Sequence, residues 1–108
     1  MKKSFAEILT DIGSDTLRKA GKKIPGWEGA RIPSALSLEQ CSSQAAAEYK
    51  CQVLKRFFSG GAASVCDLTC GLGVDSLAFS KSAAKVLSFE RLPLLAQAAR
   101  DNFSRFGA

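Results

Sequence analysis

Residues 65–75 read Val65-Cys66-Asp67-Leu68-Thr69-Cys70-Gly71-Leu72-Gly73-Val74-Asp75. The run begins as an apolar strand that ends near an acid, passes through a turn with two glycines and enters a helix. Glu90 follows a second apolar segment, seventeen residues after Gly73. Because glycine has no Cβ, the backbone N–H groups of the turn can lie close to a ligand. The spacing predicts one pocket shared by the glycine turn and the acid.

The segments around this run predict an alternation of strands and helices. Strands are expected at 62–68 and 84–89, and a helix at 76–82 with Asp75 as its cap. This order indicates a parallel sheet covered by helices, which is an α/β fold. Two strands bury too little to stand alone, so residues 61–108 are expected to form an incomplete domain, the N-terminal piece of a longer protein.

A last helix is expected to begin at Pro93 and to end at Gly107. Proline suits the first turn because its missing N–H has no partner there, and glycine suits the residue that ends a helix. Apolar side chains line one side of this helix, namely Leu95, Ala96, Ala99, Phe103 and Phe106.

Residues 1–60 predict a helical N-terminal segment. One or two helices are expected within 5–20, with a break where Ser14 or Asp15 starts a new helix. A linker rich in proline and glycine occupies about 21–36. Two apolar side chains of the linker are expected to pin it to a neighbouring surface, those of Trp27 and Ile32.

A longer helix is expected before the glycine run. Ser37-Leu38-Glu39-Gln40 fits a capping box, and Ser42 or Ser43 fits the cap of a second helix start. Gly60-Gly61 would end this second helix. Apolar residues recur in it at four-residue spacing and predict its buried face, at Ala45, Tyr49, Val53 and Phe57.

The composition is that of one globular domain. The chain has 108 residues, of which 46% are hydrophobic and 23% charged. No apolar run approaches the roughly 20 residues that span a bilayer, and no secretory leader is recognisable, so a cytoplasmic protein without membrane contact is expected. The four cysteines form no CxxC pair and the chain has no histidine. No metal site is therefore predicted.

The net charge of +5 comes mostly from the first half of the chain. Residues 1–60 hold ten Lys and Arg against six Asp and Glu, whereas 61–108 hold five against four. A basic cluster stands out at Arg18, Lys19, Lys22 and Lys23. Such a cluster can bind the phosphate backbone of a nucleic acid, but it is also typical of a solvated helix end. A non-catalytic basic module that binds nucleic acid is therefore one alternative function.

Three kinds of nucleotide site use a comparable glycine turn. A dinucleotide site has G-x-G-x-x-G, but Ser76 stands where the third glycine would be. A Walker loop needs G-x-x-x-x-G-K-[ST], and no lysine follows before Lys81. In an S-adenosylmethionine site an acid precedes the first glycine by four residues, as Asp67 does, and an anion there suits an ammonium and a sulfonium. This third kind fits best, and a dinucleotide-dependent oxidoreductase is the alternative enzyme.

At these residues the chain resembles class I S-adenosylmethionine-dependent methyltransferases, with 67–75 similar to their motif I and 89–91 to their motif II. The form D-x-x-C-G-x-G is similar to that of trimethylguanosine synthase and related RNA methyltransferases. Residues 36–44, continuing to Tyr49-Lys50, resemble a bacterial group that carries a C-terminal THUMP-like domain. The resemblance covers about 24–108 and implies the start of a Rossmann-like methyltransferase sheet.

The resemblance also implies roles for individual residues. Asp67 and the turn from Gly71 to Gly73 would face the methionine part of the cofactor. Glu90 would hold the ribose, and Arg91 and Leu92 would lie beside the adenine. The remaining cofactor contacts implied are Thr69, Cys70, Asp75 and a residue of the segment before the long helix, Ser42, Ser43 or Gln44.

The methyl acceptor implied by the resemblance and by the basic first half is RNA. Relatives often carry an Asn/Asp-Pro-Pro-aromatic catalytic motif after a later strand, and this motif does not occur in the 108 residues. No residue of the chain is therefore assigned a catalytic role, and the chain alone is expected to be inactive in methyl transfer, because that reaction depends on positioning an acceptor.

Overall fold

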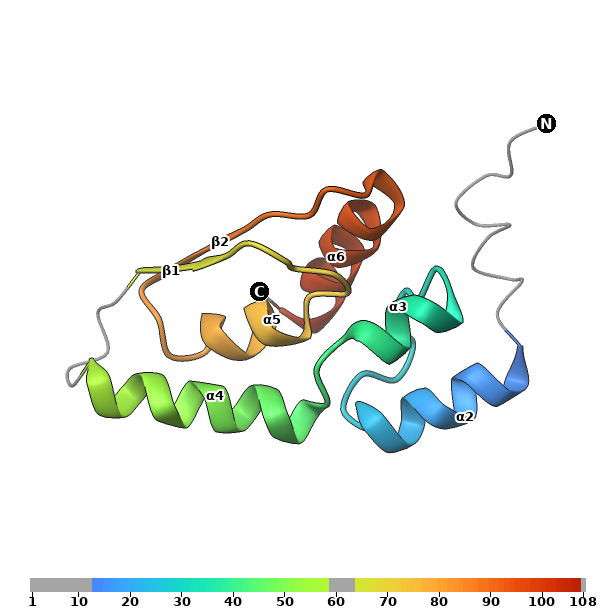
Figure 1. Cartoon of the computed structure of the whole chain (residues 1–108), viewed down its shortest axis with the longest axis horizontal. Coiled ribbons are helices and arrows are strands. Elements are labelled where there is room, and N and C mark those ends of the chain that lie inside the picture. The colour runs from blue at the N-terminus through green and yellow to red at the C-terminus, as the bar shows by residue number, and fades with distance from the viewer. Residues whose placement is uncertain (1–12, 59–63, 108) are drawn as a thin grey trace.

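The computed structural model describes residues 13–58 and 64–107, and these form helices around a small sheet (Figure 1). The helices are α2 (Ser14–Lys23), α3 (Ala35–Gln40), α4 (Gln44–Phe57), α5 (Val74–Ser80) and α6 (Pro93–Phe106). The strands are β1 (Ser64–Asp67) and β2 (Lys85–Ser88). No described helix is long and apolar enough to cross a membrane.

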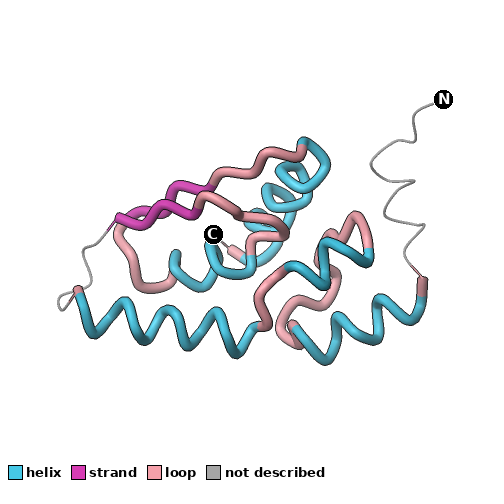
Figure 2. Tube along the Cα trace, viewed as in Figure 1, coloured by secondary structure: helices cyan, strands magenta, loops and turns pink. Residues whose placement is uncertain are grey.

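The two strands are parallel neighbours in one sheet (Figure 2). Their register pairs Val65 with Val86 and Asp67 with Ser88, so both strands end at the same edge. Helix α5 connects them and lies between the sheet and α4 (Figure 1). A parallel pair needs such a crossover, because a tight turn cannot bring the chain back in the same direction. The βαβα order and the α/β architecture predicted from the sequence are confirmed for the described residues.

Helix α5 begins earlier than the sequence predicted. Its N-cap is Gly73, whose φ of 98° lies in the left-handed region, and the helix starts at Val74. The prediction that Asp75 is the cap is therefore wrong, because this residue already lies in the first helical turn. A negative charge in the first turn still interacts favourably with the helix dipole.

Helix α2 runs three residues past the predicted end at Ala20. Its N-cap is Gly13, which has no side chain to bond the first turn, so neither Ser14 nor Asp15 is the cap. The helix ends at Lys23, where two cations in the last turn suit the C-terminal dipole. The part of the helical prediction that covers 1–12 lies outside the described residues.

The segment after α2 is pinned by its apolar side chains, as predicted. Ile24, Trp27 and Ile32 are buried. The indole of Trp27 packs on the ring of Phe106 with centroids 4.9 Å apart and planes tilted by 40°. Aromatic pairs in this range add to the free energy gained from burial. This contact joins the N-terminal segment to the last helix.

The capping box of α3 lies three residues earlier than predicted. Ser34 is the N-cap, its hydroxyl accepts the Ser37 N–H, and the Ser37 hydroxyl accepts the Ser34 N–H. The box predicted from Ser37 to Gln40 is wrong because Ser37 is already the third residue of the helix. For α4 the second of the two predicted caps is confirmed, since the Ser43 hydroxyl accepts the Ala46 N–H.

The buried face of α4 is not the predicted one. Ala47 and Cys51 are buried, whereas Tyr49 and Phe57 are 67% and 77% exposed. Small residues allow α4 to lie close to α5, and the Cys51 thiol donates to the carbonyl of Ala78 in α5 at 2.9 Å. The face of α4 with small side chains is buried because α5 lies close to it. The periodicity of apolar residues in the sequence does not reveal this neighbour. The predicted end at Gly60-Gly61 lies outside the described residues.

Helix α6 begins and ends as predicted, with Pro93 at its first position and Gly107 as a left-handed C-cap with a φ of 81°. Leu95, Phe103 and Phe106 pack against the core. The most buried residues of the helix also include Asn102, which is not exposed at all. The core gathers residues of both halves of the chain, chiefly Ile24, Trp27, Ile32, Leu38, Leu72, Val74 and Leu77.

Candidate cofactor site

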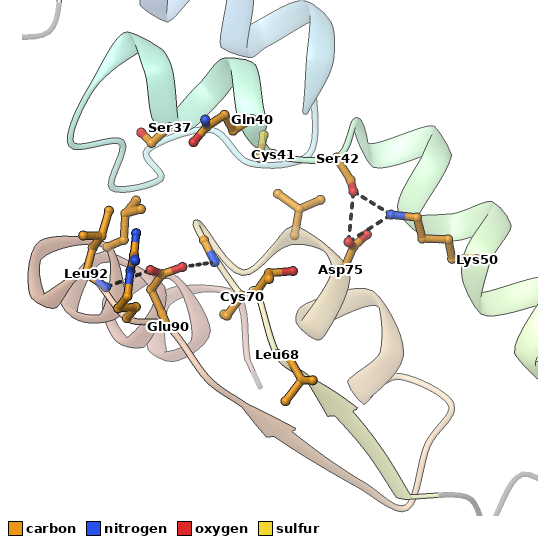
Figure 3. Close-up of a pocket in the computed structure, with 15 residues that line it drawn as sticks. Ser37, Gln40, Cys41, Ser42, Lys50, Leu68, Cys70, Asp75, Glu90 and Leu92 are labelled. Carbon is orange, nitrogen blue, oxygen red and sulfur yellow. Dashed lines mark hydrogen bonds and ion pairs between the residues drawn. The ribbon is translucent and has the colours of Figure 1, made fainter.

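A pocket of about 640 Å³ lies where the parallel strands end (Figure 3). The glycine turn after β1 and the residues after β2 form one side, and α3, the loop that follows it and Lys50 of α4 form the other. Ligands of open parallel sheets bind at this edge, beyond the carboxyl ends of the strands. The lining residues are Ser37, Gln40, Cys41, Ser42, Lys50, Leu68, Thr69, Cys70, Gly71, Val74, Asp75, Glu90, Arg91, Leu92 and Leu95.

Glu90 fixes the glycine turn to the end of β2. One carboxylate oxygen accepts the Gly71 N–H at 2.9 Å, and the other accepts the Leu92 N–H at 2.9 Å. The Cys70 N–H also donates to the carbonyl of Phe89 at 2.9 Å, which continues the contact between the two strand ends. The acid and the glycine turn, predicted from their spacing to share a pocket, do lie together on its wall.

Asp67 lies beside the pocket but is not among the residues that line it. One of its carboxylate oxygens accepts the Thr69 N–H at 3.1 Å, and the other accepts the Ser76 hydroxyl at 2.8 Å. Ser76 is buried and its hydroxyl also lies 2.7 Å from that of Ser88, so this network joins α5 to both strand ends. In a dinucleotide site a third glycine at this position lets the helix pack closely on the strand. Here this position is occupied by Ser76, whose hydroxyl is hydrogen-bonded.

A second polar group lies across the pocket from Glu90, with Cys70 between them (Figure 3). Asp75 accepts the Ser42 hydroxyl at 2.9 Å and pairs with the Lys50 ammonium at 3.0 Å, both through the same carboxylate oxygen. The Lys50 ammonium also donates to the Ser42 hydroxyl at 2.8 Å. This cluster joins α4 and α5. Lys50 could not be assigned to the site from the sequence, since 25 residues separate it from its partner carboxylate.

The other predicted site residues divide into two groups. Thr69, Cys70 and Arg91 line the pocket with the residues already described. Gly73 and Ser43 do not line it. Gly73 is buried, and Ser43 uses its hydroxyl to cap α4. Both residues are N-caps, Gly73 of α5 and Ser43 of α4, so they set where the helices beside the pocket begin.

Burial raises the pKa of both cysteines that line the pocket. Burial raises the pKa of the Cys70 thiol above its ordinary value, the hydrogen bond from Ser76 lowers it, and the nearby charge of Asp67 raises it again. Burial likewise raises the pKa of Cys41. A thiol is a nucleophile or a metal ligand only as the thiolate. Among the described residues no group of three or more potential ligand side chains could hold a metal ion.

The basic cluster of α2 is partly engaged within the chain. Asp15 pairs with Arg18 at 2.7 Å and with Lys19 at 3.3 Å, and these two cations lower the pKa of this exposed acid. The Lys23 ammonium donates to the carbonyls of Leu38 and Glu39 at the end of α3. Contact of this cluster with nucleic acid stays a prediction.

Substitution of Gly73 by alanine is expected to destabilise the fold by about 2–5 kcal/mol. The left-handed backbone costs a residue with a Cβ roughly 1–2 kcal/mol, and overpacking adds about 1–3 kcal/mol. A Cβ at Gly73 would lie 2.6 Å from Phe103 Cε1, which must move. Gly71→Ala is the matched control, because its φ is also positive but no atom lies within 4 Å of its Cβ position. Urea unfolding of both variants gives the difference, and equal losses would contradict the role of Phe103.

Comparison with known proteins gives one informative likeness. No protein-family model matches the sequence, and no curated protein matches it. The fold is similar to a crystal structure described as that of a "putative methyltransferase from Porphyromonas gingivalis W83", with a TM-score of 0.69 and 33% sequence identity. The match covers 95% of this chain and 28% of that protein. The described helices and parallel sheet are therefore a methyltransferase-like α/β fold.

Proposed function

We propose that this chain binds S-adenosylmethionine as the cofactor-binding part of a methyltransferase. The observation that carries the proposal is the pocket at the strand ends, where the Glu90 carboxylate lies against the glycine turn. The likeness to a structure described as a methyltransferase supports the same class of activity. The chain spans 28% of that structure. Methyltransferase activity is therefore proposed for this chain.

The walls of the pocket suit the nucleoside part of this cofactor. A carboxylate offers about four lone-pair sites, and backbone N–H groups use two of those on Glu90. The remaining two can accept ribose hydroxyls. Leu92 and Leu95 provide apolar surface beside Glu90 for the adenine ring, and Arg91 can stack on it.

The acids of the pocket disfavour a dinucleotide. Asp75 and Glu90 line it together with Lys50 and Arg91, so the lining holds two acids and two cations and offers a pyrophosphate no net positive charge. S-adenosylmethionine carries a sulfonium and an ammonium, which such a site attracts. This charge distribution favours the methyltransferase over the oxidoreductase alternative.

We propose RNA as the methyl acceptor, on the resemblance to RNA methyltransferases and on the net charge of +5. The proposal includes membership of the bacterial group with a THUMP-like domain and a more distant relation to trimethylguanosine synthase. Methyl transfer mainly requires an acceptor held in line with the sulfonium methyl group. The chain described here contributes the cofactor side of that arrangement.

The proposal predicts saturable one-site binding of S-adenosylmethionine by the 108-residue chain in isothermal titration calorimetry. NADH titrated under the same conditions, with its fluorescence followed, should produce no response. Binding of NADH without binding of S-adenosylmethionine would replace the proposal by the oxidoreductase. Binding of neither ligand, with salt-sensitive binding of RNA, would favour the basic module.

A further inference from the structure

We infer that Lys23, at the end of α2, positions the wall of the pocket that α3 forms. Its ammonium donates to the carbonyls of Leu38 and Glu39 at 2.7 and 2.9 Å. The next two residues of the chain, Gln40 and Cys41, line the pocket, whereas Lys23 does not. The inference rests on the proposed function of this pocket and assigns it a residue that acts only through the end of α3.

Helix α3 needs partners at both ends because it has only six residues. A helix this short is not stable alone, and the carbonyls of its last turn lack intrahelical donors. Its start is closed by the hydroxyls of Ser34 and Ser37. At its end Lys23 supplies two charge-assisted hydrogen bonds, and a cation also suits the negative end of the helix dipole. The lysine is therefore a C-terminal anchor of α3.

The backbone that carries Lys23 is held in place by packing. The lysine is partly buried, and Ile24, which follows it, is 1% exposed and lies in the same core cluster as Leu38. The Ile24 N–H donates to the carbonyl of Ala20 at 2.8 Å and closes α2. The side chain of Lys23 therefore links a fixed point of α2 to the end of α3. The neighbouring Lys22 is exposed.

The pocket depends on this link because its two walls come from separate parts of the chain. Glu90 ties the glycine turn to the end of β2, and α3 lies on the opposite wall. A ligand that binds between two walls must order any wall that moves, and this ordering lowers its affinity. Loss of the Lys23 bonds should therefore weaken binding. The alternative is that Lys23 only stabilises the fold as a whole.

Cys41 reports the position of α3 without any ligand. Its thiol donates to the Leu38 carbonyl at 3.1 Å, which is the same carbonyl that Lys23 holds. Cys51 is buried, and its thiol donates to the Ala78 carbonyl where α4 packs on α5. Release of the α3 end would expose the thiol of Cys41 alone, whereas unfolding of the chain would expose both thiols.

The test compares Lys23→Met with Lys22→Met, which removes the exposed neighbouring cation. Alkylation by iodoacetamide is followed at each cysteine by mass spectrometry, and calorimetry gives the affinity for S-adenosylhomocysteine, the product of methyl transfer. Lys23→Met should alkylate Cys41 about threefold faster or more, with the rate at Cys51 unchanged. It should bind the ligand about tenfold more weakly, since the two lost bonds involve a charged donor. Lys22→Met should change neither quantity.

The charge of Lys23 acts on the alkylation rate in the opposite direction from exposure. Burial raises the pKa of the Cys41 thiol, and the charge of Lys23 lowers it. Removal of this charge alone would raise the pKa and slow the reaction, which requires the thiolate. Faster alkylation of Cys41 in Lys23→Met would therefore show that the thiol has become more exposed.

The other outcomes contradict the inference or the function on which it rests. Faster alkylation of Cys41 and Cys51 together would show that Lys23 stabilises the whole fold, and this would overturn the inference. An unchanged or slower rate at Cys41 would overturn it too, because α3 then keeps its position without the lysine. So would an unchanged affinity beside a faster rate, because the displaced wall would not matter for binding. An original chain that does not bind S-adenosylhomocysteine would remove the proposed function, and the rate at Cys41 would still show whether Lys23 positions α3.

Discussion

Replacing Glu90 by alanine is expected to weaken binding of S-adenosylhomocysteine by about a hundredfold or more. Hydrogen bonds to a charged group contribute roughly 1.5–3 kcal/mol each, and a bidentate ribose contact contains two of them, which corresponds to at least that factor. The variant also leaves the N–H groups of Gly71 and Leu92 without their acceptor. The glycine turn then loses its link to the end of β2, so the loss affects the shape of the pocket as well as the contact.

The conservative variant Glu90→Gln separates these two contributions. A glutamine has one acceptor oxygen and an amide that donates, so it can keep only one of the two backbone bonds and is a poorer partner for hydroxyl donors. Its affinity should lie between those of the original chain and Glu90→Ala. Glu48→Ala is the control, because it removes an exposed acid of α4 that does not line this pocket. Calorimetric affinities of Glu90→Ala within threefold of the control would refute the ribose assignment.

The sequence was sufficient to locate the edge of the sheet that carries the site. The glycine turn and Glu90 were expected to share a pocket, and the parallel register brings both to one edge by pairing Asp67 with Ser88, two residues before Glu90. The contact of Glu90 with Gly71 follows from the same geometry. Both features could be predicted because they depend only on the β1–α5–β2 unit, in which the residues concerned are close in sequence.

The direction in which each polar side chain points could not be predicted in the same way. Asp67 is directed to Ser76 because a hydroxyl one turn into α5 lies within hydrogen-bond reach of it. Asp75 is directed to Lys50 only because α4 packs on α5 through its small residues. The sequence predicted that face as Tyr49 and Phe57, since periodicity ranks side chains by size and polarity and does not reveal which neighbour lies nearest.

Asn102 was not predicted from the sequence, yet its side chain connects α6 to two other segments of the chain. It stands on the apolar side of α6, three residues after Ala99, and a polar residue within an apolar stripe is the signal that could have identified it. Its side-chain oxygen accepts the Arg31 N–H at 2.6 Å, and its amide donates to the carbonyls of Arg31 at 3.2 Å and Leu72 at 3.0 Å. One buried side chain therefore connects the linker, the glycine turn and the last helix.

Asn102→Leu is expected to destabilise the chain by about 3–5 kcal/mol, although leucine has the same branched arrangement of four side-chain heavy atoms and suits an apolar environment. The substitution leaves one N–H and two carbonyl groups without partners, and each unpaired buried group costs roughly 1–3 kcal/mol, partly offset by burial of the leucine. Urea unfolding should show a lower midpoint with an unchanged slope, since the area exposed on unfolding stays the same. Gln97→Leu, on the exposed side of the same helix, should stay within about 0.5 kcal/mol of the original chain.

The position of Leu72 links this stability to binding. Leu72 lies between the two glycines of the turn, and its carbonyl is held by Asn102 while the N–H of its neighbour Gly71 is held by Glu90. Under conditions where Asn102→Leu is still folded, its affinity for S-adenosylhomocysteine should therefore fall as well, because the turn has lost one of its two side-chain anchors. A variant that is as stable as Gln97→Leu and binds equally well would show that the turn keeps its conformation without Asn102. Without Asn102 the turn would keep the Glu90 bond at Gly71 and the ring of Phe103 beside Gly73, but the Leu72 carbonyl would lose its amide donor.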